Sequence, residues 1–323
     1  MEKKSVIDRL IQNIDEKNCP IVVGLDPVIS RIPIHLKDRA LSKFGNTRQG
    51  AAEALFYFNR ELIQELHTLI PAVKLQMACY ELYGSFGISV FERTVVLAQQ
   101  YGLSVIDDSK RNDIGNTARI YAQSHLGKTP LIEGEAELDK AEFLTINPFL
   151  GSDSIDPFVS ECDKSNKGLF VLVRTSNPSS EEYQTAQAGN KPLFHQIALD
   201  LEKISSQRIG NKGFSNIGAV VGARWDKEAD ELRNLMPSVF FLVPGFGAQG
   251  ATADQVSASF NKNGYGALIN SSRGIIFAYE SKESRKSNQN QENFAAASAE
   301  AVVEMRDSLL KALSKNSKLP DQW

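Results

Sequence analysis

Short apolar runs recur along the chain at intervals that suit a repeated strand and helix unit. Each run is rich in β-branched residues and is followed by a polar or glycine-rich loop. The runs cover residues 20–27, 72–76, 103–108, 142–148, 168–174, 217–222, 239–244 and 266–272. Segments with apolar residues at helical spacing lie between them, the clearest at 51–69, 89–102 and 194–207. The pattern predicts eight strands that alternate with helices.

The alternation predicts a parallel sheet, because parallel neighbours are joined by crossover helices. The predicted strands are apolar on both faces, which is typical of a sheet covered on both sides. Eight units favour a (β/α)8 TIM barrel, in the α/β class, over an open doubly wound sheet. A doubly wound sheet that binds a dinucleotide would carry a glycine-rich fingerprint in its first turn, whereas this chain has GLDP there. No linker divides the chain, so we expect residues 1–323 to form a single barrel domain.

The chain is longer than a typical barrel of about 250 residues, and the excess falls in recognisable segments. We expect a leading helix over residues 5–17, with Ser5 and Asp8 arranged as a variant of the capping box. Residues 280–293 have the composition of a mobile surface loop, and the alanine-rich end of the chain predicts a closing helix at 294–314. Polar insertions are expected at residues 28–50, 128–141 and 177–192.

The composition argues against several classes of protein. The 323 residues carry a formal net charge of −3, so there is no overall basic footprint for nucleic acid or an anionic membrane. The first residues do not resemble a signal peptide, and no run approaches the roughly 18 apolar residues of a membrane span. We expect reduced thiols and a cytoplasmic protein. The cysteines and histidines match no metal-ligand pattern: Cys19, Cys79, Cys162, His35, His67, His125 and His195.

Polar and ionisable residues stand at the ends of almost all the predicted strands. In a barrel these ends meet on one face, where catalytic residues gather. Any one such residue is also typical of a surface loop, but their recurrence at one end of the strands predicts an active site. In chain order they are Asp26, Lys74, Asp108 with Lys110, Asn147, the stretch 174–177, the loop 244–250 and the stretch 271–274.

The segment VIDDSKRNDIGNT, residues 105–117, concentrates charge where a strand ends. Asp108 and Lys110 are two residues apart, so an extended backbone points both side chains to one face, roughly 7 Å apart at the backbone. Asp113 falls beyond the strand, and it serves either the same site or the site of a neighbouring subunit. The alternative for the whole cluster is a solvated loop with weak local salt bridges. The polar residues at the other strand ends favour the active site.

PGFGAQG at residues 244–250 and SSRG at residues 271–274 together predict a phosphate site. A glycine-rich loop presents backbone N–H groups, and Arg273 supplies a fork of donors for an oxyanion. Barrels commonly hold a phosphate in the loops after strands seven and eight. We therefore expect a small phosphorylated ligand whose reacting end meets the Asp and Lys residues. The long polar segment 175–192 is either an idle insertion or a lid that closes over this ligand.

Six motifs in chain order resemble those of orotidine 5′-phosphate decarboxylases. DSKRNDIGNT at residues 108–117 is similar to the family signature D-x-K-x-x-D-I-x-x-T. The resemblance covers essentially the whole chain and is strongest to the longer subfamily, in which KRNDIGNT and VLVRTSNP phrases are typical. The other five motifs are GLDP with Asp26, VKLQMACYE with Lys74, RTSNP with Ser176, PGFGAQG with Gln249 and SSRGI with Arg273.

The resemblance implies conversion of orotidine 5′-monophosphate (OMP) to uridine 5′-monophosphate (UMP) and CO2, the last step of pyrimidine biosynthesis, with no metal or organic cofactor. Loss of CO2 leaves a carbanion at C6 of the pyrimidine without a good electron sink, so preorganised charge must stabilise it. The family roles place Lys110 beside C6 as the proton donor. Asp108 holds Lys110 charged and lies near the departing carboxylate. Lys74 and Asp113 complete an alternating array of lysines and aspartates and position the ribose.

The resemblance also implies the substrate-binding residues and a homodimer. Asp113 and Thr117 are expected to reach across the dimer interface into the partner's site. The remaining ligands are Asp26 for the ribose, Ser176 for the pyrimidine, Gln249 and Arg273 for the phosphate, and Pro244 from the same motif as Gln249.

Two other interpretations are weighed against this one. The decarboxylase of 3-keto-gulonate phosphate and hexulose-phosphate synthase share the scaffold and an Asp-x-Lys-x-x-Asp pattern, but they stabilise an enediolate with Mg²⁺. They hold this ion with a carboxylate at the end of strand two, where this chain has Lys74, which would repel a cation. A catalytically silent nucleotide-binding barrel would lack a member of the charged array, and none is missing. Both comparisons favour the metal-free decarboxylase.

Overall fold

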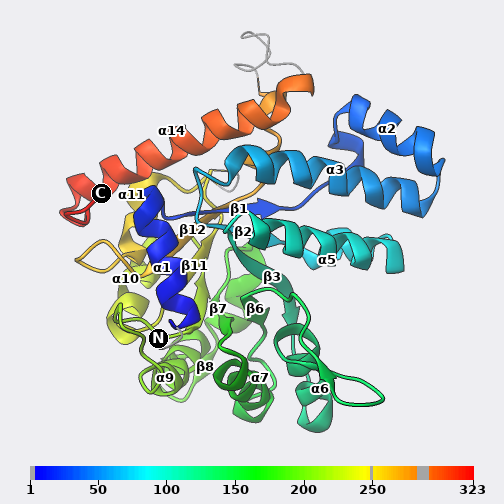
Figure 1. Cartoon of the computed structure of the whole chain (residues 1–323). Coiled ribbons are helices and arrows are strands. Elements are labelled where there is room, and N and C mark those ends of the chain that lie inside the picture. Colours follow the sequence, from blue (N-terminus) through cyan, green and yellow to red (C-terminus); the bar gives the residue numbers. More distant parts are fainter. Residues whose placement is uncertain (1–3, 248–249, 282–290) are drawn as a thin grey trace.

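Eight parallel strands close into a barrel in the computed structural model of the chain, which describes residues 4–247, 250–281 and 291–323 (Figure 1). Each strand pairs with the next one in the list below, and the last pairs with the first. Every strand overlaps one of the eight predicted runs, so the predicted (β/α)8 barrel is confirmed. The strands are β1 (Ile21–Leu25), β2 (Ala72–Leu75), β3 (Ser104–Arg111), β6 (Phe143–Ile146), β7 (Gly168–Arg174), β10 (Ile217–Val221), β11 (Phe241–Pro244) and β12 (Ala267–Ser271).

Helices surround the barrel, and those predicted from periodicity are present. Figure 1 shows the last helix, α14 (Phe294–Lys315), lying along α3 (Arg48–Leu66), where the Phe58 ring stacks on the Phe294 ring at a centroid distance of 5.0 Å. The larger helices are α1 (Val6–Lys17), α2 (Ile34–Phe44), α3 (Arg48–Leu66), α5 (Ser85–Gln100), α6 (Gly115–Leu126), α7 (Ser152–Ser165), α9 (Leu193–Ser205), α10 (Asp226–Leu235) and α14 (Phe294–Lys315). Short helices are α4 (Met77–Glu81), α8 (Glu181–Gln184), α11 (Ala253–Val256) and α12 (Arg273–Ile276).

Buried apolar side chains fill the barrel and close one of its ends. Ile106, Phe143 and Phe170 belong to the interior cluster, which is separate from the larger cluster between the strands and the helices. Leu10 and Ile14 of α1 join the same interior cluster. Helix α1 therefore plugs the barrel at the N-terminal ends of the strands, and the site can form at the other end.

The start of α1 contains half of the predicted capping box. The Ser5 hydroxyl accepts a hydrogen bond from the backbone N–H of Asp8 at 3.2 Å, as expected. The Asp8 carboxylate does not return a bond to the helix start but accepts from the N–H groups of Asn211 and Lys212, both at 2.9 Å. The reciprocal half of the prediction is wrong, because this buried carboxylate instead ties α1 to the loop before β10.

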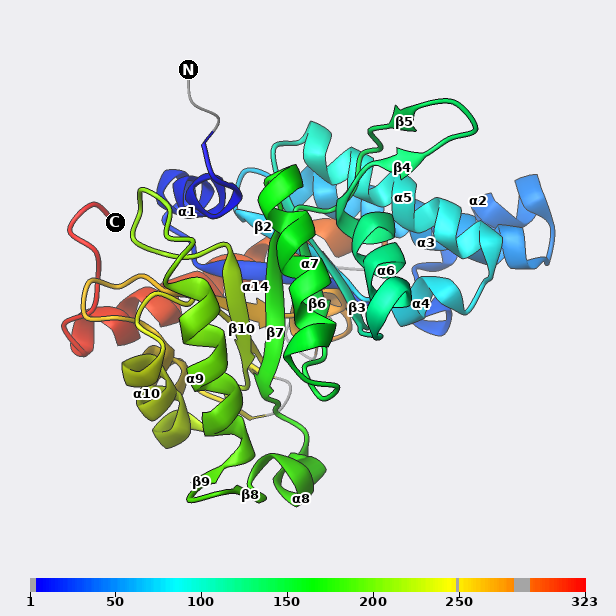
Figure 2. The same cartoon turned by 90° about the horizontal axis from the view of Figure 1, so that it is seen from below.

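The predicted polar insertions hold more regular structure than their composition indicated. Residues 28–50 contain a 3-10 turn and α2. Figure 2 shows the two hairpins of the other insertions on opposite sides of the molecule. They are β4 (Thr129–Pro130) with β5 (Glu135–Ala136), and β8 (Gln187–Ala188) with β9 (Lys191–Pro192).

The predicted mobile loop at residues 280–293 falls largely outside the described residues, which omit 282–290. Its last three residues, Gln291–Asn293, form a 3-10 turn that leads into α14. Among the described helices, none has both the length and the apolar composition needed to cross a membrane.

Candidate active site

The C-terminal ends of the barrel strands enclose a cavity of about 500 Å³. The residues that line it come from separate strands and from the loops that follow them, as the pattern of strand ends predicted. Seven of the ten predicted site residues line this cavity: Asp26, Lys74, Asp108, Lys110, Ser176, Pro244 and Arg273.

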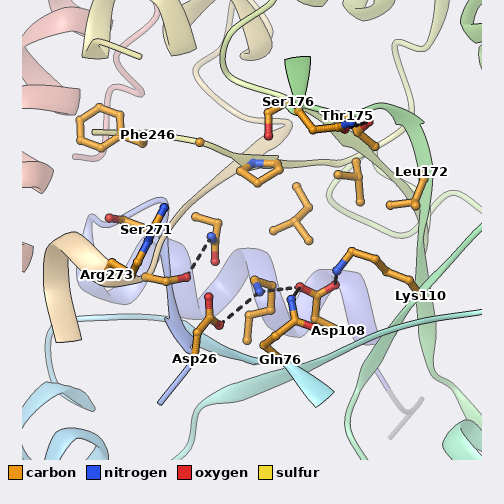
Figure 3. Close-up of a pocket in the computed structure, with 18 of the residues that line it drawn as sticks. Asp26, Gln76, Asp108, Lys110, Leu172, Thr175, Ser176, Phe246, Ser271 and Arg273 are labelled. Carbon is orange, nitrogen blue, oxygen red and sulfur yellow. Dashed lines mark hydrogen bonds and ion pairs between the residues drawn. The ribbon is translucent and has the colours of Figure 1, made fainter. Parts of the chain in front are cut away.

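Acidic and basic side chains alternate along one wall of the cavity (Figure 3). The Asp108 carboxylate accepts from two ammonium groups, with Lys74 Nζ 2.6 Å from Oδ2 and Lys110 Nζ 2.6 Å from Oδ1. On its other side, Lys74 Nζ lies 3.7 Å from Asp26 Oδ1. Within one chain the array therefore runs Asp26, Lys74, Asp108, Lys110, and each charge lies beside a charge of opposite sign.

The array keeps a buried carboxylate ionised. Burial by itself would raise the pKa of Asp108, but the charges of Lys74 and Lys110, together with the hydrogen bonds from them, lower it to about 2. Burial would likewise lower the pKa of Lys74, but the charges of Asp26 and Asp108 raise it above its ordinary value. The charges are thus set in place before any ligand binds, which is what electrostatic stabilisation of a developing charge requires.

Lys110 reaches the cavity from a bulge and not from the regular strand that its spacing predicted. Its φ is +51°, and the pairing of β3 with β6 shifts register between Asp107 and Arg111. A left-handed conformation costs a residue with a Cβ about 1 to 3 kcal/mol, so neighbouring contacts must hold it. The side chains of Asp108 and Lys110 do meet, as expected, but the expected reason, a fully extended backbone, is wrong.

Asp107 faces away from Asp108, as its place in the strand predicts. Its Oδ2 lies 2.7 Å from Nδ1 of His125 on α6, and its Oδ1 accepts from the Ser109 hydroxyl. Asp107 therefore belongs to the outer side of β3 and does not enter the charged array.

Arg273 lies at the end of the cavity opposite Lys110 (Figure 3). Its side chain is exposed and makes no ion pair with any other described residue. The neighbouring loop after β11 contains Gly245 at φ +107° and Gly247 at φ +69°, conformations that favour glycine. An unpaired guanidinium beside such a loop suits an oxyanion, in agreement with the predicted phosphate end.

The segment after β7 borders the cavity through Thr175, Ser176 and Gln184, so an idle surface insertion is the wrong interpretation. Gln184 folds back on the segment. Its Oε1 accepts from Thr175 N–H at 2.9 Å, and its Nε2 donates to Thr175 Oγ1 at 2.8 Å. Trp225 donates from Nε1 to the Thr175 carbonyl at 2.8 Å. The closing motion of a lid stays a prediction.

Gly222 makes room for the Ser176 backbone beside the cavity. A Cβ at this position would lie 2.8 Å from both the backbone nitrogen and the Cβ of Ser176. Heavy atoms do not approach that closely without a shift, so any larger residue would displace Ser176. The glycine at the end of β10 is thus a requirement of the site.

Two of the predicted residues that the structure describes, Asp113 and Thr117, do not line the cavity of this chain. Asp113 lies beyond β3, where its Oδ1 accepts from the backbone N–H of Ile114 at 2.7 Å. Thr117 is exposed near the start of α6. Gln249 lies outside the described residues. The assignment of Asp113 and Thr117 to a partner's site stays a prediction.

Three further residues in or beside the cavity were not expected from the sequence: Gln76 and Asn270 line it, and Thr145 contacts Asp108. Gln76 Nε2 donates to Asp108 Oδ2 at 3.2 Å, and the Thr145 hydroxyl donates to Asp108 Oδ1 at 2.9 Å. Asn270 lines the cavity, and its Oδ1 is buried without a hydrogen-bond partner among the described residues. Each lies two positions from a residue at a predicted strand end, so the period of two in a strand was the signal that could have found them.

Comparison with known families decides how this geometry is interpreted. The model of the Orotidine 5′-phosphate decarboxylase / HUMPS family matches residues 21–287. The chain belongs to this family. The match begins at the first residue of β1 and extends past β12, so it includes every strand of the barrel.

Relatives from the decarboxylase branch of this family cover almost the whole chain. The orotidine 5′-phosphate decarboxylase of Petrotoga mobilis is 39% identical over 306 residues, which are 94% of this chain and 98% of that protein. The one from Clostridium perfringens strain SM101 is 38% identical over 311 residues, 96% of this chain and 100% of that protein. The structure of Leishmania donovani OMP decarboxylase has a TM-score of 0.67 at 27% identity and covers 94% of this chain and 99% of that chain. Such coverage includes the insertions, in agreement with the longer subfamily.

Proposed function

We propose that this cavity decarboxylates OMP to UMP and CO2, the reaction that completes the biosynthesis of UMP. The observation that carries the proposal is the Asp108 carboxylate held between two ammonium groups, each at 2.6 Å. Decarboxylation at C6 leaves negative charge with no electron sink in the ring, and a fixed cation next to that carbon stabilises this charge directly. Family membership and the identity to decarboxylase relatives support the same reaction.

The proposed orientation of OMP follows from the two ends of the cavity. Arg273, which has no ion partner among the described residues, takes the phosphate. The ribose hydroxyls provide donors for two buried acceptors that lack them, Asp26 Oδ1 and Asn270 Oδ1. Ser176 then meets the pyrimidine under the segment that follows β7. Pro244 and Gln249 remain predicted ligands from the same motif.

In the proposed chemistry, Lys110 has the role of proton donor. The bond between C6 and the carboxylate breaks, CO2 leaves, and the electron pair stays on C6 next to Lys110 Nζ. One proton passes from the ammonium to C6, and the neutral amine is then reprotonated from solvent. The Lys110 side chain is 44% exposed, so it is accessible both to the ligand and to water. A positioned acid of this kind contributes roughly 10² to 10⁴ in rate.

Asp108 and Lys74 support this step in the proposal. Asp108 keeps the Lys110 ammonium at the reacting carbon, and its charge opposes that of the substrate carboxylate until CO2 departs. Lys74 balances both neighbouring acids. Leu172, Val220 and Leu242 also line the cavity, and an apolar wall strengthens these electrostatic interactions because it excludes water.

The branch of the family that uses Mg²⁺ is the second candidate, and Lys74 argues against it. The ammonium of Lys74 lies between two carboxylates at the end of β2. Its pKa is raised, so the group stays charged at neutral pH and would repel a divalent cation at this point. Repulsion at the place where that branch needs a metal-ligating carboxylate favours the metal-free reaction.

The test is a direct assay on protein treated with EDTA. We expect the ultraviolet absorbance of OMP to fall as it is converted, with no need for added Mg²⁺. The Lys110→Met variant should lose at least about 100-fold in kcat, because it lacks the proton donor. Absence of turnover by the wild-type protein would refute the proposal, whereas activity restored only by Mg²⁺ would support the other branch.

We also propose a homodimer in which Asp113 and Thr117 complete the partner's site. Support comes from their position, because neither lines the cavity of its own chain. They lie next to apolar side chains that are open to solvent in the single chain, with Ile114 57% exposed and Ile120 66% exposed. Clustered exposed apolar residues of this kind are typical of an interface.

Mixing two inactive variants tests this arrangement. Lys110→Met removes the donor from its own site, and Asp113→Asn would damage only the partner's site. Random reassortment of co-refolded subunits makes half of the dimers mixed, each with one intact site, so about a quarter of wild-type activity should return. If Asp113 acts within its own chain, mixing should restore nothing.

A further inference from the structure

Thr145 joins Asp108 and Lys110 of β3 to the neighbouring strand. Its hydroxyl lies on β6, only 1% of the residue is exposed, and it faces the barrel interior. The hydroxyl donates to Asp108 Oδ1 at 2.9 Å and accepts from the backbone N–H of Lys110 at 3.0 Å. Both capacities of the hydroxyl are thus used by the segment that carries the charged array.

These bonds close a ring that includes the Lys110 side chain. Asp108 Oδ1, which receives the Thr145 hydroxyl, also receives Lys110 Nζ at 2.6 Å. The ring therefore runs from the Lys110 backbone through Thr145 and Asp108 back to the Lys110 ammonium. A closed ring of this kind sets the distance between the backbone of Lys110 and its charged end.

The bulge at Lys110 explains why such a ring is needed. The left-handed backbone at φ +51° lies where the pairing of β3 with β6 shifts register. At this irregular point Thr145 of β6 supplies a side-chain acceptor for the N–H of Lys110. Without it, the backbone at residue 110 would lose this bond to β6, and the ammonium would lose its fixed position.

We propose that Thr145 is a positioning residue for decarboxylation, which holds the Lys110 bulge and the Asp108 carboxylate so that the Lys110 ammonium is directed at C6. The inference rests on the proposed function. Thr145 acts at the reacting end of the cavity and not at the phosphate end, where Arg273 lies. Its loss should therefore lower kcat and leave the binding of phosphate and ribose intact.

Thr145→Val keeps the shape of the side chain and removes the hydroxyl. We expect kcat for OMP to fall roughly 10- to 100-fold, because a hydrogen bond to a charged group and the acceptor of the bulge are both lost. Kd for UMP should change by less than about twofold, since UMP has no C6 carboxylate. KM for OMP should also change by less than about twofold, because the phosphate and ribose are bound away from Thr145. Thr145→Ser keeps the hydroxyl and should restore kcat to within about threefold of the wild-type value.

Thr94→Val is the matched control. Thr94 is also fully buried and its hydroxyl donates to the Val90 carbonyl at 2.7 Å, but it lies on α5 outside the cavity. We expect Thr94→Val to lower Tm and to leave kcat unchanged.

The outcomes distinguish a failure of the positioning role of Thr145 from a failure of the proposed decarboxylation. An unchanged kcat in Thr145→Val, or a fall in kcat that Thr145→Ser does not reverse, would overturn the positioning role. So would a parallel loss of kcat and UMP binding that Thr94→Val reproduces, because that pattern is a structural defect. If the wild-type protein does not turn over OMP, the proposed function fails and this inference fails with it.

Discussion

Replacement of Lys74 by methionine removes one charge from the array with little change in side-chain volume. The Lys74 side chain is 5% exposed, and its Nζ lies 2.6 Å from Asp108 and 3.7 Å from Asp26. These values place it among buried ion pairs, for which loss of one partner costs about 3 to 5 kcal/mol, and not among surface pairs worth 0 to about 1 kcal/mol. We therefore expect Lys74→Met to lower the free energy of unfolding by about 3 to 5 kcal/mol, because the buried Asp108 carboxylate and the partly buried Asp26 carboxylate lose their shared cation.

Urea unfolding followed by circular dichroism measures this change, provided that the m-value stays the same. Lys315→Met is the matched control. Lys315 lies 2.9 Å from Asp254, but the two side chains are 67% and 55% exposed, so the expected cost is below about 1 kcal/mol. The double variant Lys74→Met with Asp108→Asn should lose at least about 2 kcal/mol less than the sum of the single changes, because the two residues share one interaction.

Two results would refute the reasoning about Lys74. One is a cost no larger than that of Lys315→Met, which would mean that burial does not strengthen the pair. The other is strict additivity in the double variant, which would mean that Lys74 and Asp108 do not stabilise each other. In either case Lys74 could not be the group that keeps Asp108 ionised.

Three further predictions address the phosphate end, the segment after β7 and the response to acid. Arg273→Ala should lower kcat/KM for OMP by about 100-fold or more through loss of a bidentate phosphate contact, and an unchanged kcat/KM would remove Arg273 from the site. Gly222→Ala should lower kcat/KM because its new Cβ would stand 2.8 Å from the Ser176 backbone nitrogen, so wild-type kinetics would show that Ser176 need not stay where it is. The pKa of Asp108 is lowered to about 2 by folding, so its contribution to stability is present above pH 4 and is lost as the pH falls towards 2. The stability difference between wild type and Asp108→Asn should accordingly shrink by about 1 kcal/mol between pH 5 and pH 3, and a constant difference would contradict the lowered pKa.

The sequence pattern alone located the eight barrel strands, because a strand that is buried on both faces needs a continuous run of apolar residues. The expected fold therefore matched the structure strand by strand. The same reasoning failed inside the insertions, where α2 and two hairpins formed in segments that composition marked only as polar. Such segments are stabilised by contacts with the rest of the molecule, and composition does not report those contacts.

The predicted site residues were found by their place at strand ends, and most of them do line one cavity. What the spacing could not show is how they arrive there. Lys110 was expected on an extended strand, but it comes from a left-handed bulge whose partner, Thr145, is 35 residues further along the chain. Gln76 and Asn270 were missed because amides have no chemistry that singles them out in a sequence, although their alternation with predicted residues was visible.

By itself, the sequence determined the barrel, the end of it that carries the chemistry, and the set of charged residues in the site. Local patterns suffice for these, because a strand's burial and the face on which its last residues point are properties of a few neighbouring positions. Only the tertiary structure decided that Asp108 lies between Lys74 and Lys110 at 2.6 Å from each, and that Asp113 stays outside this chain's cavity. Distances between strands depend on register, bulges and closure of the barrel, and the charge balance of Asp108 follows from those distances.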